Sequence, residues 1–566
     1  MRHFIDSIIN DRRAISRSAI AFLLFFTVLY TGCKKGSDDA PILKDTSLSF
    51  TVNGAYNGSL TYTSLNTKPV IAFTFTDPID PVTVSDGIRF QTSASVAVPF
   101  SSTLSDGNRT LTITPVSDLL SFSTYTLSAT SAFRSAAGGK LINAVNISLS
   151  IGLDNTDKFA VISDNALLDL VQKQTLKYFY DFGHPVSGLA RERSTSGETV
   201  TTGGSGFGVM AMVAGASRGF ITRNEALLRI QKIVTFLNTK ADRFHGAFSH
   251  WLNGTTGKVQ PFSANDNGAD LVETSFLLQG LITARQYFNG ANPEETALRA
   301  EINAIYNSVE WDWFRQGGQN ALYWHWSPDK NWAINLKVGG WNEALMVYVL
   351  AASSTTSTIP KAVYDSGWAN NGAMKNGNNY YGYNLPLGTA NGGPLFLSHY
   401  SFMAIDPNGL SDAYANYELQ TKNHTLINRA YCIANPKGYV GYSADCWGLT
   451  ASDTYNGYTA SSPSNDVGTI APTAAIASMP YTPAESMQAL KFFYYKLGNR
   501  TWGEYGFVDA FNLSQGWFDT QTLAIDQGPI IVMIENHRSK LLWNLFMSAP
   551  EVKAGMRKLG FTGPSL

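Results

Sequence analysis

Charged residues are scarce in this sequence of 566 residues. They make up 15% of it, against roughly 25% in a typical soluble protein, and the formal net charge is −1. A chain with so little net charge produces no long-range field that would attract a polyanion or an anionic lipid surface. We therefore expect no nucleic acid as a partner. Aromatic residues, at 12%, and glycine, at 49 residues, are abundant instead, which favours a neutral polymer such as a glucan.

Cysteine is also rare, with only Cys33, Cys432 and Cys446. No spacing of Cys and His residues suits zinc, so we expect no metal. If Cys33 carries a lipid, as argued below, the other two thiols lie outside the cytoplasm, where a disulfide would persist. A bridge between them would close a short loop and contribute about 3 kcal/mol at most, and the sequence leaves their pairing open.

Familiar nucleotide-binding and nucleophile motifs are missing as well. The glycine-rich segment Gly203–Gly206 lacks the lysine of a phosphate-binding loop, and neither Ser205 nor Ser398 lies in a hydrolase elbow. We therefore expect no cofactor.

The first 33 residues have the order of a secretory signal. Basic residues precede the apolar run Ala19–Tyr30, and Thr31-Gly32-Cys33 follows. This order resembles a bacterial lipoprotein signal that ends at a lipidated Cys33, with a polar tether over residues 34–46. A single transmembrane anchor is the alternative, but the apolar run is shorter than the ~20 residues that a span needs. We expect a cell-envelope lipoprotein, on the periplasmic side of the outer membrane or at the cell surface.

Residues 47–154 alternate between apolar and polar side chains with the period of two that is typical of β-strands. Turn formers separate these runs at the spacing of a small all-β sandwich of the immunoglobulin type. The region carries no catalytic cluster, so we interpret it as a spacer, with a weak binding module as the alternative. The clearest strands are Val70–Phe75, Thr110–Thr114, Tyr125–Leu127 and Asn146–Ile151.

Residues 160–566 have helical apolar spacing, with long loops rich in glycine, asparagine and aromatic residues between the helices. This pattern favours an all-α (α/α) toroid whose loops build one face. We expect a monomer, although the pattern itself does not give the oligomeric state. No repeat of 20 to 50 residues is present, which disfavours a regular solenoid. The predicted helices are Leu167–Tyr180, Gly206–Ser217, Asn224–Leu237, Leu271–Phe288, Glu295–Val309, Glu343–Ala352, Glu485–Leu497, Gly528–Glu535 and Lys540–Met547.

Three acids precede the apolar part of the predicted helix 271–288. If the stretch is helical from Asn265 onwards, Asp266, Asp270 and Glu273 share one face at steps of four and three residues. An interior helix with an acidic mouth suits a binding or catalytic site. Alternatively, Asp270 is the N-cap and Asp266 lies in the loop before it, because Asp270 and Glu273 have capping-box spacing.

Glu343 opens another apolar helix, directly after Gly339–Asn342 and close in sequence to several tryptophans. An acid among aromatic rings loses solvation of its charged form, so its pKa should rise, as a proton donor near neutral pH requires. The alternative is that Glu343 only compensates the helix dipole in the first turn.

Asp526 follows an apolar run and precedes Gly528-Pro529. It could simply cap the helix after it. Paired with Glu343, however, it makes up the two carboxyls that glycoside hydrolysis requires, one acid for the leaving oxygen and one base for water.

Four segments carry a family resemblance: Asn265–Glu273, Gly340–Glu343, Trp502–Phe511 and Ile525–Arg538. Together they resemble the bacterial glycoamylase-like domain, over roughly residues 165–566. Within that group the chain is most similar to the endo-β-1,2-glucanases of glycoside hydrolase family 144. The resemblance implies an (α/α)6 barrel, an inverting mechanism, and β-1,2-glucan or its oligosaccharides as the substrate.

The resemblance also implies roles for single residues. Glu343 matches the acid of the family and Asp526 its candidate base, while Asp266, Asp270 and Glu273 match the acidic cluster at the pocket. Asp270 and Asp266 remain rivals of Asp526 for the role of base. The family name does not settle the linkage, or whether cleavage is endo or exo.

Rings on the loops are expected to contact sugars by stacking or by hydrogen bonds. The candidates are Trp324, Trp326, Trp332, Trp341, His399, Tyr400 and Trp447, in addition to Asp266 and Glu273.

Three other functions remain as alternatives. The segment Ser398-His399-Tyr400 would fit a polysaccharide lyase, but the loops are poor in the cations that a uronate needs. A noncatalytic glycan-binding surface lipoprotein would use the same rings without chemistry. An exo-acting glucosidase or glucoamylase-like enzyme of another linkage specificity is the third.

Overall fold

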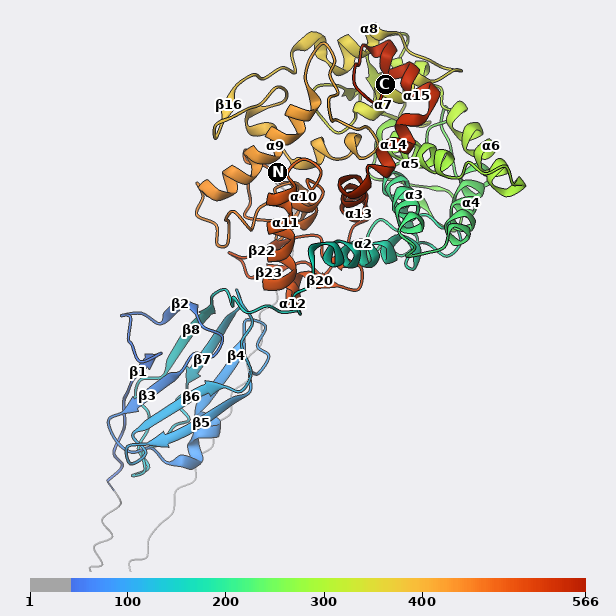
Figure 1. Ribbon diagram of the computed structural model, residues 1–566. Helices are drawn as coiled ribbons and strands as arrows, with labels where there is room; N and C mark the ends of the chain where they lie inside the picture. Colours follow the sequence, from blue (N-terminus) through green and yellow to red (C-terminus); the bar gives the residue numbers. More distant parts are fainter. Residues whose placement is uncertain (1–41) are drawn as a thin grey trace, which may run out of the picture.

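The computed structural model describes residues 42–566, so the predicted signal and Cys33 lie outside the described residues. Figure 1 shows two parts, a β-sandwich drawn in blue and a larger helical domain drawn from green to red. Within residues 42–566, no helix is both long and apolar enough to cross a membrane.

The sandwich consists of two four-stranded sheets with the orders β1-β3-β6-β5 and β2-β8-β7-β4, in which β2 and β8 are the parallel pair. Side chains such as Phe73, Leu111 and Leu149 point inward and are fully buried. They alternate with more exposed neighbours because successive side chains of a strand point to opposite faces. The predicted all-β sandwich is confirmed. Its strands are β1 (Leu48–Val52), β2 (Thr61–Leu65), β3 (Ile71–Phe75), β4 (Ile88–Thr92), β5 (Phe100–Ser105), β6 (Thr110–Pro115), β7 (Thr124–Ala129) and β8 (Val145–Ile151).

The helical domain contains helices of eight residues or more over its whole length. They are α2 (Asp164–Tyr180), α3 (Thr202–Ser217), α4 (Arg223–Thr239), α5 (Leu271–Tyr287), α6 (Pro293–Asn307), α7 (Leu345–Ser353), α9 (Tyr417–Ala434), α11 (Pro483–Lys491), α13 (Ala524–Ser539), α14 (Leu541–Ser548) and α15 (Pro550–Leu559). Long loops with short strand pairs separate many of them, as predicted.

Helices α3, α5, α7 and α13 form the interior of this domain. Helix α3 packs against α2, α5 and α13, and α5 packs against α7. The whole stretch Thr202–Gly215 of α3 is buried, as expected of a helix that is surrounded by others. Helices α3 and α5 approach closely at two glycines. A Cβ atom at Gly206 would lie 2.0 Å from the carbonyl oxygen of Phe276, and one at Gly280 would lie 2.1 Å from that of Gly206, so neither position has room for a side chain.

Helix α5 begins at Leu271, as predicted, and Asp270 is its N-cap, so the alternative interpretation of this stretch is confirmed and Asp266, Asp270 and Glu273 do not share one helical face. Two other helix starts differ from the predicted ones, and each concerns a candidate site residue. Helix α7 begins at Leu345, so Glu343 lies in the turn before it. Helix α13 begins at Ala524, so Asp526 lies inside its first turn and does not cap it.

A second core cluster, beside α9, α10 (Pro472–Ile476) and α11, decides one question that the sequence left open and corrects one prediction. Cys432 and Cys446 are buried free thiols, so the disulfide that the sequence left open is not formed. Trp447 packs in the same cluster with no exposed surface. Because a ring must be exposed to stack on a sugar, the predicted sugar contact of Trp447 is wrong in this structure.

The sandwich contacts the helical domain near α12 (Gly498–Thr501), as Figure 1 shows. Arg500 donates hydrogen bonds to the carbonyl oxygen of Ser121, at 3.3 Å, and to Oγ of Ser123, at 3.0 Å. Its guanidinium also lies 4.0 Å from the ring centre of Phe518, and Phe122 packs against the second core cluster.

Candidate active site

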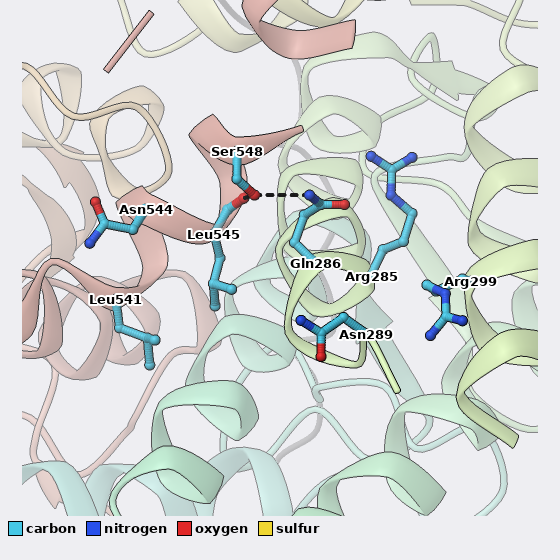
Figure 2. Close-up of a pocket in the computed structure, with 8 residues that line it drawn as sticks. All are labelled: Arg285, Gln286, Asn289, Arg299, Leu541, Asn544, Leu545 and Ser548. Atoms are coloured by element: carbon cyan, nitrogen blue, oxygen red, sulfur yellow. Dashed lines mark hydrogen bonds between the residues drawn. The ribbon is translucent and has the colours of Figure 1, made fainter. Parts of the chain in front are cut away.

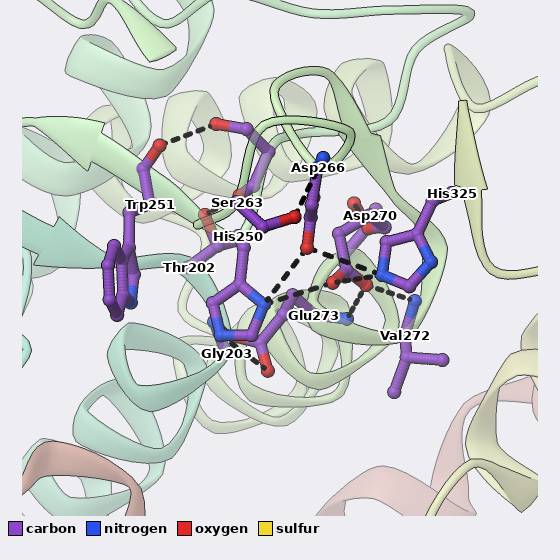
Figure 3. Close-up of polar contacts among 12 residues, drawn as sticks. Thr202, Gly203, His250, Trp251, Ser263, Asp266, Asp270, Val272, Glu273 and His325 are labelled. Carbon is purple, nitrogen blue, oxygen red and sulfur yellow. Dashed lines mark hydrogen bonds and ion pairs between the residues drawn. The ribbon is translucent and has the colours of Figure 1, made fainter. Parts of the chain in front are cut away.

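The N-terminus of α5 brings together three acids and two histidines, which we call the histidine cluster (Figure 3). Asp270 caps the helix, and its Oδ1 accepts hydrogen bonds from the amides of Val272 and Glu273, both at 2.9 Å. The reciprocal bond of a capping box is not made, because Oε2 of Glu273 accepts from the amide of Gly203 instead, at 2.8 Å. The cluster comprises Asp266, Asp270, Glu273, His250 and His325.

Both histidines reach the acids from other parts of the chain. Nδ1 of His250 lies 3.1 Å from Oδ2 of Asp270 and 4.0 Å from Oδ2 of Asp266. Nε2 of His325 lies 3.4 Å from Oδ2 of Asp266 and 3.5 Å from Oδ2 of Asp270. His325 is held there because β12 (Ala269–Asp270) pairs with β14 (His325–Trp326), with Asp270 opposite His325.

The charges of the histidine cluster set its titration. Burial alone would raise the pKa of Asp270, but hydrogen bonds from both histidines outweigh burial and hold that pKa well below its usual range. Burial lowers the pKa of His250, but Glu273, Asp270 and Asp266 raise it to about 9. Burial and the charge of Asp270 raise the pKa of Asp266 to about 6. Asp270 is thus a permanent carboxylate between two histidines that favour the protonated form.

Glu343 lies in the turn before α7, where Oδ1 of Asn342 accepts a hydrogen bond from the amide of Ala344 at 2.9 Å. Oγ of Ser401 donates to the carbonyl oxygen of Glu343 and fixes the turn from the other side. Burial raises the pKa of Glu343 to about 7, and the charges of Glu273 and Asp270 add to the rise. This direction agrees with the prediction from its aromatic surroundings.

Asp526 belongs to a second group of acids, which we call the carboxyl cluster: Asp453, Asp509, Asp519 and Asp526. Asp453 lies in β18 (Ala451–Thr454), Asp509 and Asp519 lie in loops, and Asp526 lies in the first turn of α13. Asp509 and Asp526 are each only 2% exposed. Burial raises the pKa of Asp526 to about 7. The cation of this cluster is Arg193, whose Nη1 lies 2.8 Å from Oδ2 of Asp453 and whose Nε lies 2.9 Å from Glu192.

A cavity of about 450 Å³ lies between the two clusters. A volume of this size is typical of small-molecule sites. Two acids, Glu273 and Glu343, and two tyrosines, Tyr400 and Tyr458, are among the residues that line it. Asp526 is not among the lining residues, but Ile525, its neighbour in sequence, is. Other lining residues are Glu192, Arg193, Thr201, His250, Trp251, Phe262, Phe396, Ala451, Ala460, Leu523 and Ile525.

Of the aromatic residues predicted to contact sugar, one lines the cavity and the others do not. Tyr400 lines the cavity, whereas His399 is 1% exposed and bonds Oγ of Ser478 through Nε2 at 3.0 Å. Trp341 is 8% exposed and packs against Phe402. The predicted sugar contact of His399 is therefore wrong in this structure, whereas that of Trp341 stays a prediction.

Three more tryptophans lie outside the lining of this cavity. Trp326 and Trp332 pack around Trp313, with ring centres 5.2 and 4.9 Å from it, and Trp324 stacks on His325. Their predicted role in binding sugar stays a prediction.

A separate shallow pocket of about 420 Å³ lies far from these acids (Figure 2). Its lining includes Arg285, Gln286 and Asn289, at or just after the C-terminal end of α5. Because a helix rises 1.5 Å per residue, the pocket lies roughly 18 Å along α5 from Glu273. The guanidinium of Arg285 is already paired with Glu551 and Asn303, so the pocket offers no free catalytic group.

Sequence reasoning missed several residues of the site. His250, Arg193 and Asp453 were not singled out, since a lone histidine, arginine or aspartate in a loop gives no local signal. Asp509 lies in the segment Trp502–Phe511, which carries the family resemblance, but its position in the sequence indicates no role. Three donors in each cluster lie within 4.8 Å of one another and could hold a metal ion, namely His250, Asp266 and Asp270 in one and Asp453, Asp509 and Asp519 in the other.

Comparisons with known proteins give the family. Residues 335–550 match the glycoamylase family model, described as "Putative glucoamylase", and residues 44–150 match that of a bacterial Ig-like domain. The chain is 52% identical to an endo-β-1,2-glucanase of Chitinophaga pinensis solved with sophorotriose and glucose, with a TM-score of 0.70, over 72% of this chain and 100% of that one. A β-1,2-glucanase structure from Parabacteroides distasonis is 40% identical, with a TM-score of 0.69, over 92% of this chain and 73% of that one.

A curated relative differs in its mode of action. The chain is 48% identical over 443 residues to an exo-β-1,2-glucooligosaccharide sophorohydrolase (non-reducing end) of Parabacteroides distasonis. The match covers 74% of this chain and spans 61% of the length of that protein. The chain belongs to the glycoamylase-like family, and the resemblance inferred from its motifs is confirmed.

Proposed function

We propose that the protein is a glycoside hydrolase that cleaves β-1,2-glucan or its oligosaccharides. The observation that carries this proposal is Glu343, an acid that lines the cavity and whose pKa burial raises to about 7. A second buried acid with a raised pKa, Asp526, follows Ile525 of the cavity lining. The substrate class is supported by the β-1,2-glucan-cleaving relatives of this chain.

Glu343 acts as the general acid in this proposal. A group with a pKa near 7 keeps its proton in a large fraction of molecules at neutral pH, yet transfers it readily to the oxygen of a breaking glycosidic bond. Glu343 suits this role better than Asp526 because it lines the cavity.

Asp526 acts as the general base on water. Its pKa of about 7 leaves it ionised in part of the molecules at neutral pH and makes it a stronger base than an exposed aspartate. Asp270 is a poorer base, since Oδ1 accepts two amides and Oδ2 holds the histidines, so neither oxygen is free for water. Asp266 faces the same histidines and is assigned to substrate binding with Glu273.

Base catalysis on water gives inversion of the anomeric centre. We propose endo cleavage, as in the relative from Chitinophaga pinensis, and we propose that the helix pairs form an (α/α)6 barrel. We also propose that the mature chain is a monomer anchored to the outer membrane through a lipid on Cys33. A Cys33→Ala chain should then leave the membrane fraction, and membrane retention would contradict the anchor.

The test of function is release of reducing ends from β-1,2-, β-1,3-, β-1,4- and α-1,4-glucans. Only the β-1,2-linked polymer should be cleaved, and Glu343→Gln should lower kcat about 10²-fold or more while substrate still binds. The control is Glu504→Gln at an exposed glutamate, which should change kcat by less than about twofold. Near-normal turnover of Glu343→Gln would refute the assignment.

Product analysis tests the finer proposals. An endo enzyme gives mixed oligosaccharides and a rapid fall in viscosity, whereas release of disaccharide from one end alone would indicate exo action. NMR of the first product should show the anomer opposite to that of the substrate, and retention would exclude Asp526 as a base on water.

A further inference from the structure

Two carboxyl groups of the carboxyl cluster face each other away from solvent. Asp509 precedes β22 (Phe511–Asn512), and Asp526 lies in the first turn of α13. Oδ1 of Asp509 and Oδ2 of Asp526 are buried and have no N–H or hydroxyl partner among residues 42–566. The two side chains lie within hydrogen-bonding distance of each other.

Two carboxylates in this position would repel each other without water to screen them. A buried pair of this kind is stable when it holds one proton, which turns one member into a donor to the other. A shared proton also gives both orphan oxygens the partner that buried polar atoms require.

The surroundings decide which member holds the proton. The other oxygen of Asp509, Oδ2, accepts a hydrogen bond from the amide of Asp453 at 2.7 Å, so the proton of this pair sits on Oδ1. Burial raises the pKa of both acids, but the hydrogen bond between them acts in opposite directions: it raises the pKa of Asp509, as its donor, and lowers that of Asp526, as its acceptor. Within the pair, the proton is therefore held by Asp509.

We propose that Asp509 is a positioning residue that stays a neutral carboxylic acid and donates its Oδ1–H to Oδ2 of Asp526. The bond holds the Asp526 side chain in one orientation and stabilises its ionised form, which is the form that takes a proton from water. This inference rests on the proposed role of Asp526 as the base.

The other groups around the pair do not supply this bond. Arg193 is occupied by Asp453 and Glu192, and Asp519 uses Oδ1 to accept the amides of Thr520 and Gln521. Burial and the charge of Asp526 raise the pKa of Tyr400 and of Tyr458. These are the titratable and charged groups that act on the pair.

The geometry makes asparagine a close substitute for a protonated Asp509. In Asp509→Asn the side-chain oxygen can accept the amide of Asp453, and the NH2 group can donate to Asp526. In Asp509→Leu neither bond is possible, so Asp526 loses its donor and its pKa should rise further.

The experiment compares pH profiles of kcat for these two variants with Asp526→Asn. Asp509→Leu should lower kcat about tenfold or more at pH 6 and shift the acidic limb of the profile upwards by one pH unit or more. Asp509→Asn should recover at least tenfold of that loss, with the limb near its wild-type position. Asp526→Asn should stay about 10²-fold impaired at every pH.

Several outcomes would contradict the proposed role of Asp509 or of Asp526. If folded Asp509→Asn is as inactive as Asp526→Asn, Asp509 is more than a neutral donor and the proposal is wrong. If Asp526→Asn remains active, the proposed function fails instead. If chelation with EDTA inactivates the wild type and Ca²⁺ restores activity and raises its Tm, the cluster holds a cation and not a proton. Should Asp509→Leu fail to fold, the Asp509→Asn result alone decides.

Discussion

The histidine cluster and the carboxyl cluster border the same cavity and contain similar numbers of buried acids, but they neutralise them differently. In the histidine cluster, two imidazoles pair with Asp270 and Asp266 at 3.1 to 3.5 Å. In the carboxyl cluster, Arg193 forms an ion pair with Asp453. The pKa values of Asp509, Asp519 and Asp526 are raised, which favours their neutral forms. Hydrogen bonds from both histidines keep Asp270 ionised, whereas Asp526, which is buried without an ion pair among the described residues, has a pKa of about 7 and exchanges protons near neutral pH. The first arrangement suits binding, and the second suits proton transfer.

The largest expected effect is on kcat, and it distinguishes proton transfer by the carboxyl cluster from substrate binding by the histidine cluster. Asp526→Asn should lower kcat about 10²-fold or more with KM little changed, because the base acts only in the transition state. Glu273→Gln should instead raise KM with a smaller change in kcat, since Glu273 lines the cavity and is assigned to binding. Steady-state kinetics on β-1,2-oligosaccharides give both constants. A pure KM effect in Asp526→Asn would reverse the assignment of the two clusters.

The second effect concerns stability. Asp270→Asn keeps an oxygen for the N-cap but leaves two protonated histidines without their shared carboxylate. Breaking a buried charge pair from one side costs about 3 kcal/mol, so urea unfolding at pH 7 should show a loss of that order. Asp329→Asn, at an exposed aspartate on the nearby loop, is the control and should change the free energy of unfolding by less than about 0.5 kcal/mol. Equal losses in both variants would show that the pairing contributes nothing.

The helices and strands were largely predictable, and the site only in part. Periodicity predicted α2 to α6 and four of the strands, because burial of one face or of all faces leaves a direct trace in the sequence. Helix α9 was not predicted, since it buries polar side chains such as Gln420, His424 and Asn428, which bond neighbouring loops. Strand β5 has the weak pattern FSSTLS and was also not predicted.

The candidate site shows where sequence patterns stop being informative. Local spacing indicated Asp266, Asp270 and Glu273, although only Glu273 is helical. His325 joins them through the pairing of β12 with β14, which no local pattern predicts. Trp447 was predicted to contact sugar but is fully buried in the core. The sequence alone does not distinguish a tryptophan on a loop surface from one in the core.

A third prediction uses pH to test the histidine cluster. The pKa of His250 is raised from 6.5 to about 9 in the folded state, so its pairing stabilises fully below about pH 6.5 and is lost as the pH rises through 9. The difference in the free energy of unfolding between wild type and His250→Gln should therefore shrink between pH 6.5 and 9, by at most about 3 kcal/mol. His537→Gln is the control and should show no such decline, since burial lowers the pKa of His537. A constant difference would mean that His250 is not charged in the folded protein.

The smallest expected effect is that of Asp519→Asn on the free energy of unfolding. The substitution is chemically the same as Asp270→Asn, but we expect it to stabilise the protein, whereas Asp270→Asn should destabilise it. Burial raises the pKa of Asp519 to about 6, so its ionised form costs stability that sets in above pH 3.8 and is complete above pH 6. Asp519→Asn can still accept the amides of Thr520 and Gln521 and can donate to Asp453, so it should stabilise the protein by up to about 1 kcal/mol at pH 8 and by nothing at pH 4. Denaturant unfolding at the two pH values measures this. A loss of stability at pH 8 would show that Asp519 is paired as Asp270 is, by a bound cation in place of a histidine, and the contrast between the two clusters would disappear.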